Sequence, residues 1–133
     1  MPEARLRIHA RAEIVWRLLI DTTAWPNWGP SVRAVDCPTR LVGPGVSGRL
    51  QTAVGVWLPF SIAEWDPGRF WSWKVAGVSA TGHTVIATGK NSCDAIFTVP
   101  RWAPFYLPVC RRALHRLAIL AAEQSPEQGH GLG

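Results

Sequence analysis

The side chain best suited to proton chemistry in this 133-residue sequence is His83, which lies in the alternating segment Thr81–Thr88. Alternate side chains of a strand share one face, so Val85 should point the same way as His83. On an inward face, His83 could donate a hydrogen bond to a ligand carbonyl or act as a general acid or base. A structural histidine bonded to a neighbour is the simpler explanation of the position. His83 is therefore a catalytic candidate, and no catalytic residue is firmly assigned.

An enzyme that used His83 would need a second group, and two carboxylates, Glu64 and Asp66, flank a turn signal. The sequence Asp66-Pro67-Gly68 is typical of a tight turn, which predicts that Asp66 caps this turn. A lone carboxylate can move protons near neutral pH only if burial or a neighbour shifts its pKa.

Tryptophan is unusually abundant, and a domain of this size cannot easily bury eight indoles in a solid core. Trp71 and Trp73 are two residues apart and should share one strand face, opposite Ser72 and Lys74. Lys74 is costly to bury without a partner, so the two indoles should face inward. They either pack a core or line a cavity. The tryptophans are Trp16, Trp25, Trp28, Trp57, Trp65, Trp71, Trp73 and Trp102.

The sequence carries no recognisable metal or cofactor motif. Its three cysteines, Cys37, Cys93 and Cys110, are widely spaced and odd in number, which argues against a disulfide framework or a zinc site. No P-loop, GxGxxG, HExxH or GxSxG pattern occurs. We therefore expect no metal and no cofactor.

Charge and hydropathy limit the partners. The formal net charge is +5, but the twelve arginines are scattered rather than clustered, so a nucleic-acid partner is not predicted. No apolar run reaches the roughly 18 residues that span a bilayer, which argues against integral membrane association. The N-terminal segment lacks the apolar core of a signal peptide. These features predict a soluble, cytoplasmic protein.

The elements that would position these side chains can be read from periodicity. Alternation predicts a strand over Ala4–His9, and helical spacing predicts a helix over Ala12–Asp21. A short helix or turn should follow near Trp25 and Trp28, which we expect to pin it to the core.

Six more strands are predicted to form an antiparallel meander, because short turn segments separate them. The strand predicted over Trp57–Trp65 has apolar residues on both faces, so its pattern does not show which face points inward. The six predicted ranges are Ser31–Leu41, Ser47–Val54, Trp57–Trp65, Phe70–Ala76, Thr81–Thr88 and Cys93–Val99.

The last part of the chain changes to helical period. Apolar residues at i, i+3, i+4 and i+7 steps predict a long amphipathic helix that begins near Ala103 or Leu107 and ends at Glu123. Cys110 and Leu114 lie on its apolar face, and Trp102 should fasten the helix to the sheet. A sheet with one long apolar helix is an α+β arrangement. Residues 1–124 are predicted to form one domain, followed by a flexible tail over 125–133.

Several motifs occur in a characteristic order between about residues 4 and 123. They are Val15-Trp16 with Leu18-Leu19 and Asp21, Trp25-Pro26-x-Trp28-x-Pro30, Glu64-Trp65-Asp66-Pro67-Gly68-Arg69, Trp71-Ser72-Trp73, Gly77 and His83. This order resembles the SRPBCC superfamily, which includes START lipid-binding domains, birch-pollen-allergen-like proteins and polyketide cyclase/dehydrase-like proteins. The resemblance implies a helix-grip fold, in which a curved seven-strand sheet surrounds the long helix, with an apolar tunnel between them. It does not imply one activity.

Three functions fit these observations. The first is binding of an apolar or aromatic, lipid- or polyketide-like small molecule between the sheet and the C-terminal helix. The second is a polyketide cyclase/dehydrase-like reaction that uses His83 and a pocket carboxylate. The third is a protein-interaction domain with surplus tryptophans in a homodimer interface. For the first, we expect an enclosed, mostly apolar pocket with His83 as its polar contact. Its expected ligand-binding residues are Trp71, Trp73, His83, Val85, Cys110 and Leu114.

Overall fold

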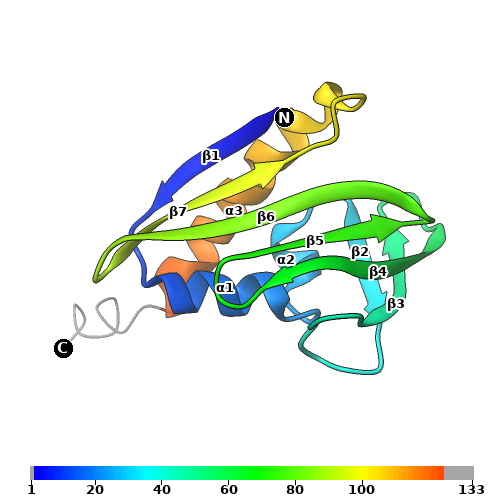
Figure 1. Ribbon diagram of the computed structural model, residues 1–133, viewed down its shortest axis with the longest axis horizontal. Helices are drawn as coiled ribbons and strands as arrows, with labels where there is room; N and C mark the ends of the chain where they lie inside the picture. The colour runs from blue at the N-terminus through cyan, green and yellow to red at the C-terminus, as the bar shows by residue number, and fades with distance from the viewer. Residues whose placement is uncertain (1, 125–133) are drawn as a thin grey trace.

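The computed structural model describes residues 2–124, which form one antiparallel sheet and the helices packed on it (Figure 1). The strand order across the sheet is β1-β7-β6-β5-β4-β3-β2. The strands are β1 (Glu3–Ile8), β2 (Val32–Asp36), β3 (Ser47–Thr52), β4 (Trp57–Asp66), β5 (Phe70–Val75), β6 (Val78–Gly89) and β7 (Ser92–Thr98). The helices are α1 (Ala12–Ile20), α2 (Trp25–Trp28), the 3-10 turn η1 (Pro104–Tyr106) and α3 (Leu107–Gln124).

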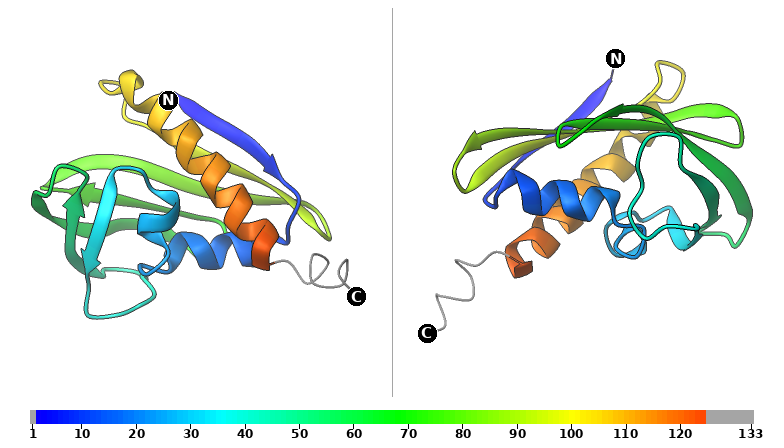
Figure 2. Two further views of the ribbon diagram at one scale, coloured as in Figure 1. Left: turned by 180° about the vertical axis from the view of Figure 1, so that it is seen from behind. Right: turned by 60° about the horizontal axis from the view of Figure 1, so that its bottom comes forward.

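The predicted fold class is confirmed. Figure 2 shows α3 crossing the sheet on the same side as α1, so that the curved sheet closes around the long helix. The inner side of α3 is buried at Cys110, Leu114 and Leu117, as its helical spacing predicts. The tail predicted over 125–133 lies outside the described residues.

Cross-strand register places one row of large rings on the inner face of the sheet. Trp65 pairs with Trp71 across β4 and β5, and Trp71 pairs with His83 across β5 and β6. His83 pairs in turn with Phe97 on β7. Side chains that lie directly opposite each other in an antiparallel sheet are in contact, so this row forms a continuous layer.

A β-bulge settles the inward face of β4, which the sequence left undecided. Phe60 and Ile62 are buried on the inner face, and Ile62 pairs with Trp73. The register then shifts, so that Glu64 pairs with Ser72 on the outer face. The extra residue, Ala63, lets the strand present Ile62 and later Trp65 to the same side. Bulges also bend a sheet, which helps β4 and β5 to curve.

Three strand boundaries differ from the predicted ranges by two residues or more. β2 ends at Asp36 rather than Leu41, β3 ends at Thr52 rather than Val54, and β6 begins at Val78 rather than Thr81. The chain after β2 is held by side-chain contacts and by a short backbone bridge instead of a longer ladder. Asp21 accepts hydrogen bonds from the Arg40 guanidinium at 3.0–3.2 Å, and an isolated bridge joins Asp21 to Leu41.

The tryptophans before β2 have the structural role that the sequence predicted. Trp25 Nε1 donates a hydrogen bond to the Leu19 carbonyl at 2.8 Å, and Trp28 Nε1 donates to the Leu18 carbonyl at 3.0 Å. These two bonds fasten α2 to the end of α1. Trp102 does not behave as expected, because its side chain is 63% exposed instead of joining α3 to the sheet.

Candidate ligand-binding site

The larger cavity, here called the outer cavity, has a volume of about 440 Å³ and lies where the β5–β6 turn faces the segment before α3. Its wall is mostly apolar, and it opens to the surface between Val54, Val78, Trp102 and Phe105, which are all exposed. The lining residues are Ser31, Val32, Leu50, Thr52, Ala53, Val54, Leu58, Trp73, Val75, Val78, Ser79, Ala80, Thr81, Val99, Pro100, Trp102, Ala103, Phe105 and Tyr106.

A second, much smaller space of about 40 Å³, here called the inner cavity, lies deeper between the sheet, α2 and α3. Its lining residues are Trp25, Trp28, Gly29, Pro30, Ser31, Val32, Trp71, Trp73, Thr81, His83, Phe97, Tyr106, Val109, Cys110 and Ala113. Neither cavity has an Asp, Glu, Lys or Arg in its lining, as far as the described residues go.

The two cavities adjoin, because they share Ser31, Val32, Trp73, Thr81 and Tyr106. The Ser31 and Tyr106 hydroxyls are hydrogen-bonded to each other at 2.5 Å across this shared wall. We call the Ser31–Tyr106 pair the partition.

The inner cavity is small because aromatic rings fill the space around it. Trp25 from α2 stacks on Trp71, with ring centroids 5.6 Å apart and planes inclined by 13°. Trp71 also stacks on His83, with ring centroids 4.0 Å apart and planes inclined by 25°. Phe97 meets His83 edge to face at 4.9 Å. The inward face of β5 is therefore a packed aromatic layer next to a narrow gap.

His83 takes part in a directed chain of hydrogen bonds. Its Nδ1 lies 3.3 Å from the Trp71 carbonyl oxygen, which can only accept, so Nδ1 carries the hydrogen. Nε2 must then accept, and Thr81 Oγ1 donates to it at 3.0 Å. Thr81 Oγ1 accepts in turn from Trp73 Nε1 at 3.0 Å. This tautomer is assigned from the partners, and it occupies both ring nitrogens within the protein.

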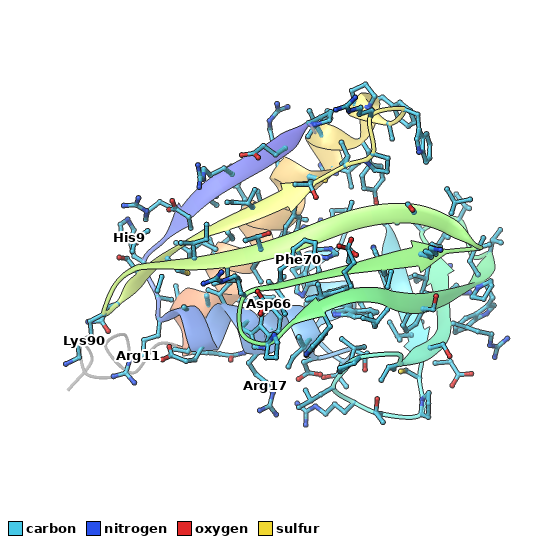
Figure 3. The ribbon with its side chains drawn as sticks, viewed as in Figure 1. His9, Arg11, Arg17, Asp66, Phe70 and Lys90 are labelled. Carbon is cyan, nitrogen blue, oxygen red and sulfur yellow. The ribbon has the colours of Figure 1, made fainter. Side chains whose placement is uncertain are left out.

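Burial lowers the pKa of His83 to about 3, and the hydrogen bond to the Trp71 carbonyl opposes this effect only partly. The imidazole is therefore neutral at physiological pH. No carboxylate in the described part of the chain lines the cavity beside it: Glu64 accepts a hydrogen bond from Ser72 on the outer face, and Asp66 is exposed. Figure 3 shows Asp66 and Phe70 at the β4–β5 turn, at the other end of β5 from the outer cavity.

The two buried cysteines offer no activated thiol. Burial raises the pKa of Cys110 and of Cys93 to about 11, so both thiols stay protonated near neutral pH. No group of three His, Cys, Asp or Glu side chains that could hold a metal ion occurs within residues 2–124. Over the same residues, none of the helices is long and apolar enough to cross a membrane.

Four of the six residues predicted to bind the ligand line a cavity, and two do not. Trp71, His83 and Cys110 line the inner cavity, and Trp73 lines both cavities. Val85 and Leu114 line neither cavity, since both are packed in the core. Their role in binding stays a prediction.

The sequence predicts the main cavity deeper in the fold than the outer cavity lies, and this difference has a physical cause. The sequence-based prediction placed Trp71 and Trp73 in a pocket between the sheet and the C-terminal helix, whereas Trp25 from α2 stacks on Trp71 and occupies that space. It also missed Phe105 and Tyr106 as wall residues. The available signal was the segment Pro100–Pro104, which predicts irregular chain where exposed rings need not pack in a core.

Comparison with known proteins identifies a family for nearly the whole chain. The model of the family described as "Polyketide cyclase / dehydrase and lipid transport" matches residues 3–120. No curated protein matches the chain at the threshold applied.

Several solved structures have the same fold at low sequence identity. XoxI from Bacillus cereus is 13% identical, with a TM-score of 0.69 over 91% of this chain and 94% of that one. A protein from Mesorhizobium loti is 13% identical, with a TM-score of 0.69 over 92% and 98%. Norcoclaurine synthase from Thalictrum flavum, solved in complex with dopamine and hydroxybenzaldehyde, is 14% identical, with a TM-score of 0.60 over 92% and 86%.

Proposed function

Since this chain belongs to the polyketide cyclase/dehydrase and lipid transport family, we propose that it binds one neutral, apolar or aromatic small molecule in the outer cavity. The observation that carries this proposal is the cavity itself. Its volume of about 440 Å³ falls in the range of ligand pockets, and no charged side chain within residues 2–124 lines it. A charged ligand would lose its hydration there without gaining an ion-pair partner.

The wall favours binding through burial of apolar surface. Leu58, Trp73, Val75 and Val99 supply apolar side chains from two strands, β4 and β5, and from the segment that follows β7. A ligand that buries about 300 Å² of apolar surface would gain about 7.5 kcal/mol. The loss of translational and rotational freedom offsets part of this gain. Trp102 and Phe105 lie at the mouth, where they would cover the outer side of the ligand.

The same observations favour binding over a cyclase/dehydrase-like reaction. His83 would have to give up its hydrogen bond with Thr81 before its Nε2 could take a proton from a ligand. Its pKa of about 3 makes it a weak base, and the cavity linings supply no carboxylate to support it.

Titration with N-phenyl-1-naphthylamine, a neutral fluorescent probe, tests the proposal. The probe should bind saturably with one site per chain, accept energy from the tryptophans and be displaced by fatty or aromatic compounds. Ala80→Trp adds an indole at the wall of the outer cavity and should weaken binding at least tenfold.

The matched control is Ala87→Trp, which makes the same change on the same strand at an exposed position that lines neither cavity. It should leave the dissociation constant within twofold. The proposal is wrong if the probe does not bind, or if folded Ala80→Trp protein binds it as tightly as the control does.

A further inference from the structure

Trp71 carries a polar group that the protein does not satisfy. Its side chain is fully buried, and no acceptor among the described residues lies within hydrogen-bonding distance of Nε1. A buried indole N–H usually has a partner, because leaving it unpaired costs the free energy of removing it from water. The site around Trp71 should therefore be able to receive an acceptor atom.

The Trp71 indole borders the inner cavity. Trp25 and His83 both stack on this ring. Stacked rings cover the faces of an indole rather than its edge, and Nε1 is one of the edge atoms. Trp71, Trp25 and His83 all line the inner cavity.

The remaining ring nitrogens around the inner cavity are already used. The indoles of Trp25 and Trp28 donate to backbone carbonyls, and the indole of Trp73 donates to Thr81. His83 uses both of its nitrogens. One hydroxyl hydrogen of the partition also lacks an assigned acceptor, because only one of the two hydroxyls donates in their mutual bond. The Trp71 indole N–H and this hydroxyl are therefore the donors that remain, and both are uncharged.

We propose that the inner cavity is a polar subsite that takes one uncharged hydrogen-bond acceptor of the ligand, such as a ketone, aldehyde or ester carbonyl, whose oxygen accepts from Trp71 Nε1. This proposal rests on the proposed function, since the apolar body of the same ligand would occupy the outer cavity. About 40 Å³ holds two or three water-sized groups, which is enough for a carbonyl and a small substituent. A carboxylate would find no cation in either lining.

Such a ligand would pass the partition. When its carbonyl group enters, the hydroxyls of Ser31 and Tyr106 separate. Their mutual hydrogen bond is lost, but each hydroxyl can then bond to the ligand or to the backbone. The polar end of the ligand would therefore be positioned by donors on two sides, while its apolar end would be held by surface burial alone.

A pair of matched probes tests the subsite: 2-acetylnaphthalene carries a carbonyl, and 2-ethylnaphthalene has the same ring system without it. In ¹H,¹⁵N spectra of the wild-type protein, the Trp71 indole N–H should move downfield when 2-acetylnaphthalene binds, and much less when 2-ethylnaphthalene binds. Trp71→Phe keeps a stacking ring but removes the donor. In this variant, the dissociation constant of 2-acetylnaphthalene should rise about threefold to tenfold relative to that of 2-ethylnaphthalene. Trp57→Phe, at an exposed position that lines neither cavity, should leave this ratio unchanged.

The results separate failure of the subsite from failure of the proposed function. If neither probe binds, the proposed function is wrong and the subsite is wrong with it. If both bind but the Trp71 proton does not move, or the ratio is the same in folded Trp71→Phe, only the subsite is wrong. Should Trp71→Phe not fold, the wild-type spectra decide the question, with the same two outcomes.

Discussion

His83 shows how much the meaning of a residue depends on its partners. Its alternation with Val85 predicts that the two side chains share one face, and both residues are buried in the structure. The hydrogen bond of His83 to the Trp71 carbonyl and its stacking on Trp71 could not be predicted, because they depend on the register between β5 and β6. The residue that looked most reactive in the sequence is a neutral, fully bonded part of the wall.

The lowered pKa of His83 predicts a dependence of stability on pH. An unfolded histidine titrates near pH 6.5, whereas folded His83 titrates at about 3. Between these values the unfolded chain binds the proton and the folded chain does not. The free energy of unfolding should therefore be highest above pH 6.5 and fall as the pH drops, with His83 contributing about 1.4 kcal/mol per pH unit.

Urea denaturation at several pH values from about 4.5 to 7.5 would measure this slope in the wild-type protein and in His83→Phe. The variant keeps an aromatic ring at this position but has no imidazole to titrate. The slope of its free energy of unfolding against pH should therefore be smaller by the contribution of His83. The carboxylates titrate in both proteins and cancel in the comparison. Equal slopes in the two folded proteins would mean that His83 is protonated in the folded state in this pH range.

At the scale of elements, periodicity predicts the strands and the long helix but not where their irregularities lie. Alternation identifies the inward residues of β1 and β5, and helical spacing identifies those of α3. The bulge at Ala63 produces no recognisable pattern, because it interrupts alternation in a strand that is apolar on both faces. The four-residue helix α2 is too short to show its buried face in the sequence, although its Trp25 determines how much space remains beside Trp71.

The β5–β6 turn offers a test of element geometry next to the outer cavity. Ala76 has a φ of 52° and Gly77 a φ of 78°, so the left-handed region is occupied twice in succession. Glycine adopts this conformation freely, but alanine does so at a cost of about 1 kcal/mol. Asparagine tolerates the left-handed region better, so Ala76→Asn should stabilise the protein by about 0.5–1 kcal/mol.

Thermal or urea denaturation of Ala76→Asn would measure the gain. Ala87→Asn, at an exposed strand position of β6, is the control and should be neutral or slightly destabilising, since asparagine disfavours strands. If Ala76→Asn lowers the stability as much as the control does, the turn does not have the left-handed geometry described.

At the scale of the whole molecule, the resemblance to the SRPBCC superfamily is confirmed by the family match and by structures of the same fold. That resemblance predicted an apolar space between sheet and helix, but family membership does not fix its size. Here the aromatic layer around Trp71 reduces the inner space to about 40 Å³. The larger volume lies toward the mouth, where Trp102 and Phe105 are exposed instead of packed.

The central claim is that an apolar ligand occupies the outer cavity, and intermolecular NOEs from bound N-phenyl-1-naphthylamine to assigned methyl groups test it most directly. The probe should show NOEs to the methyl groups of Val75 and Val99, which line that cavity, and none to Ile86 or Ile119, which are exposed elsewhere. NOEs confined to Ile86 or Ile119, or none to the cavity valines in a saturated complex, would contradict the account.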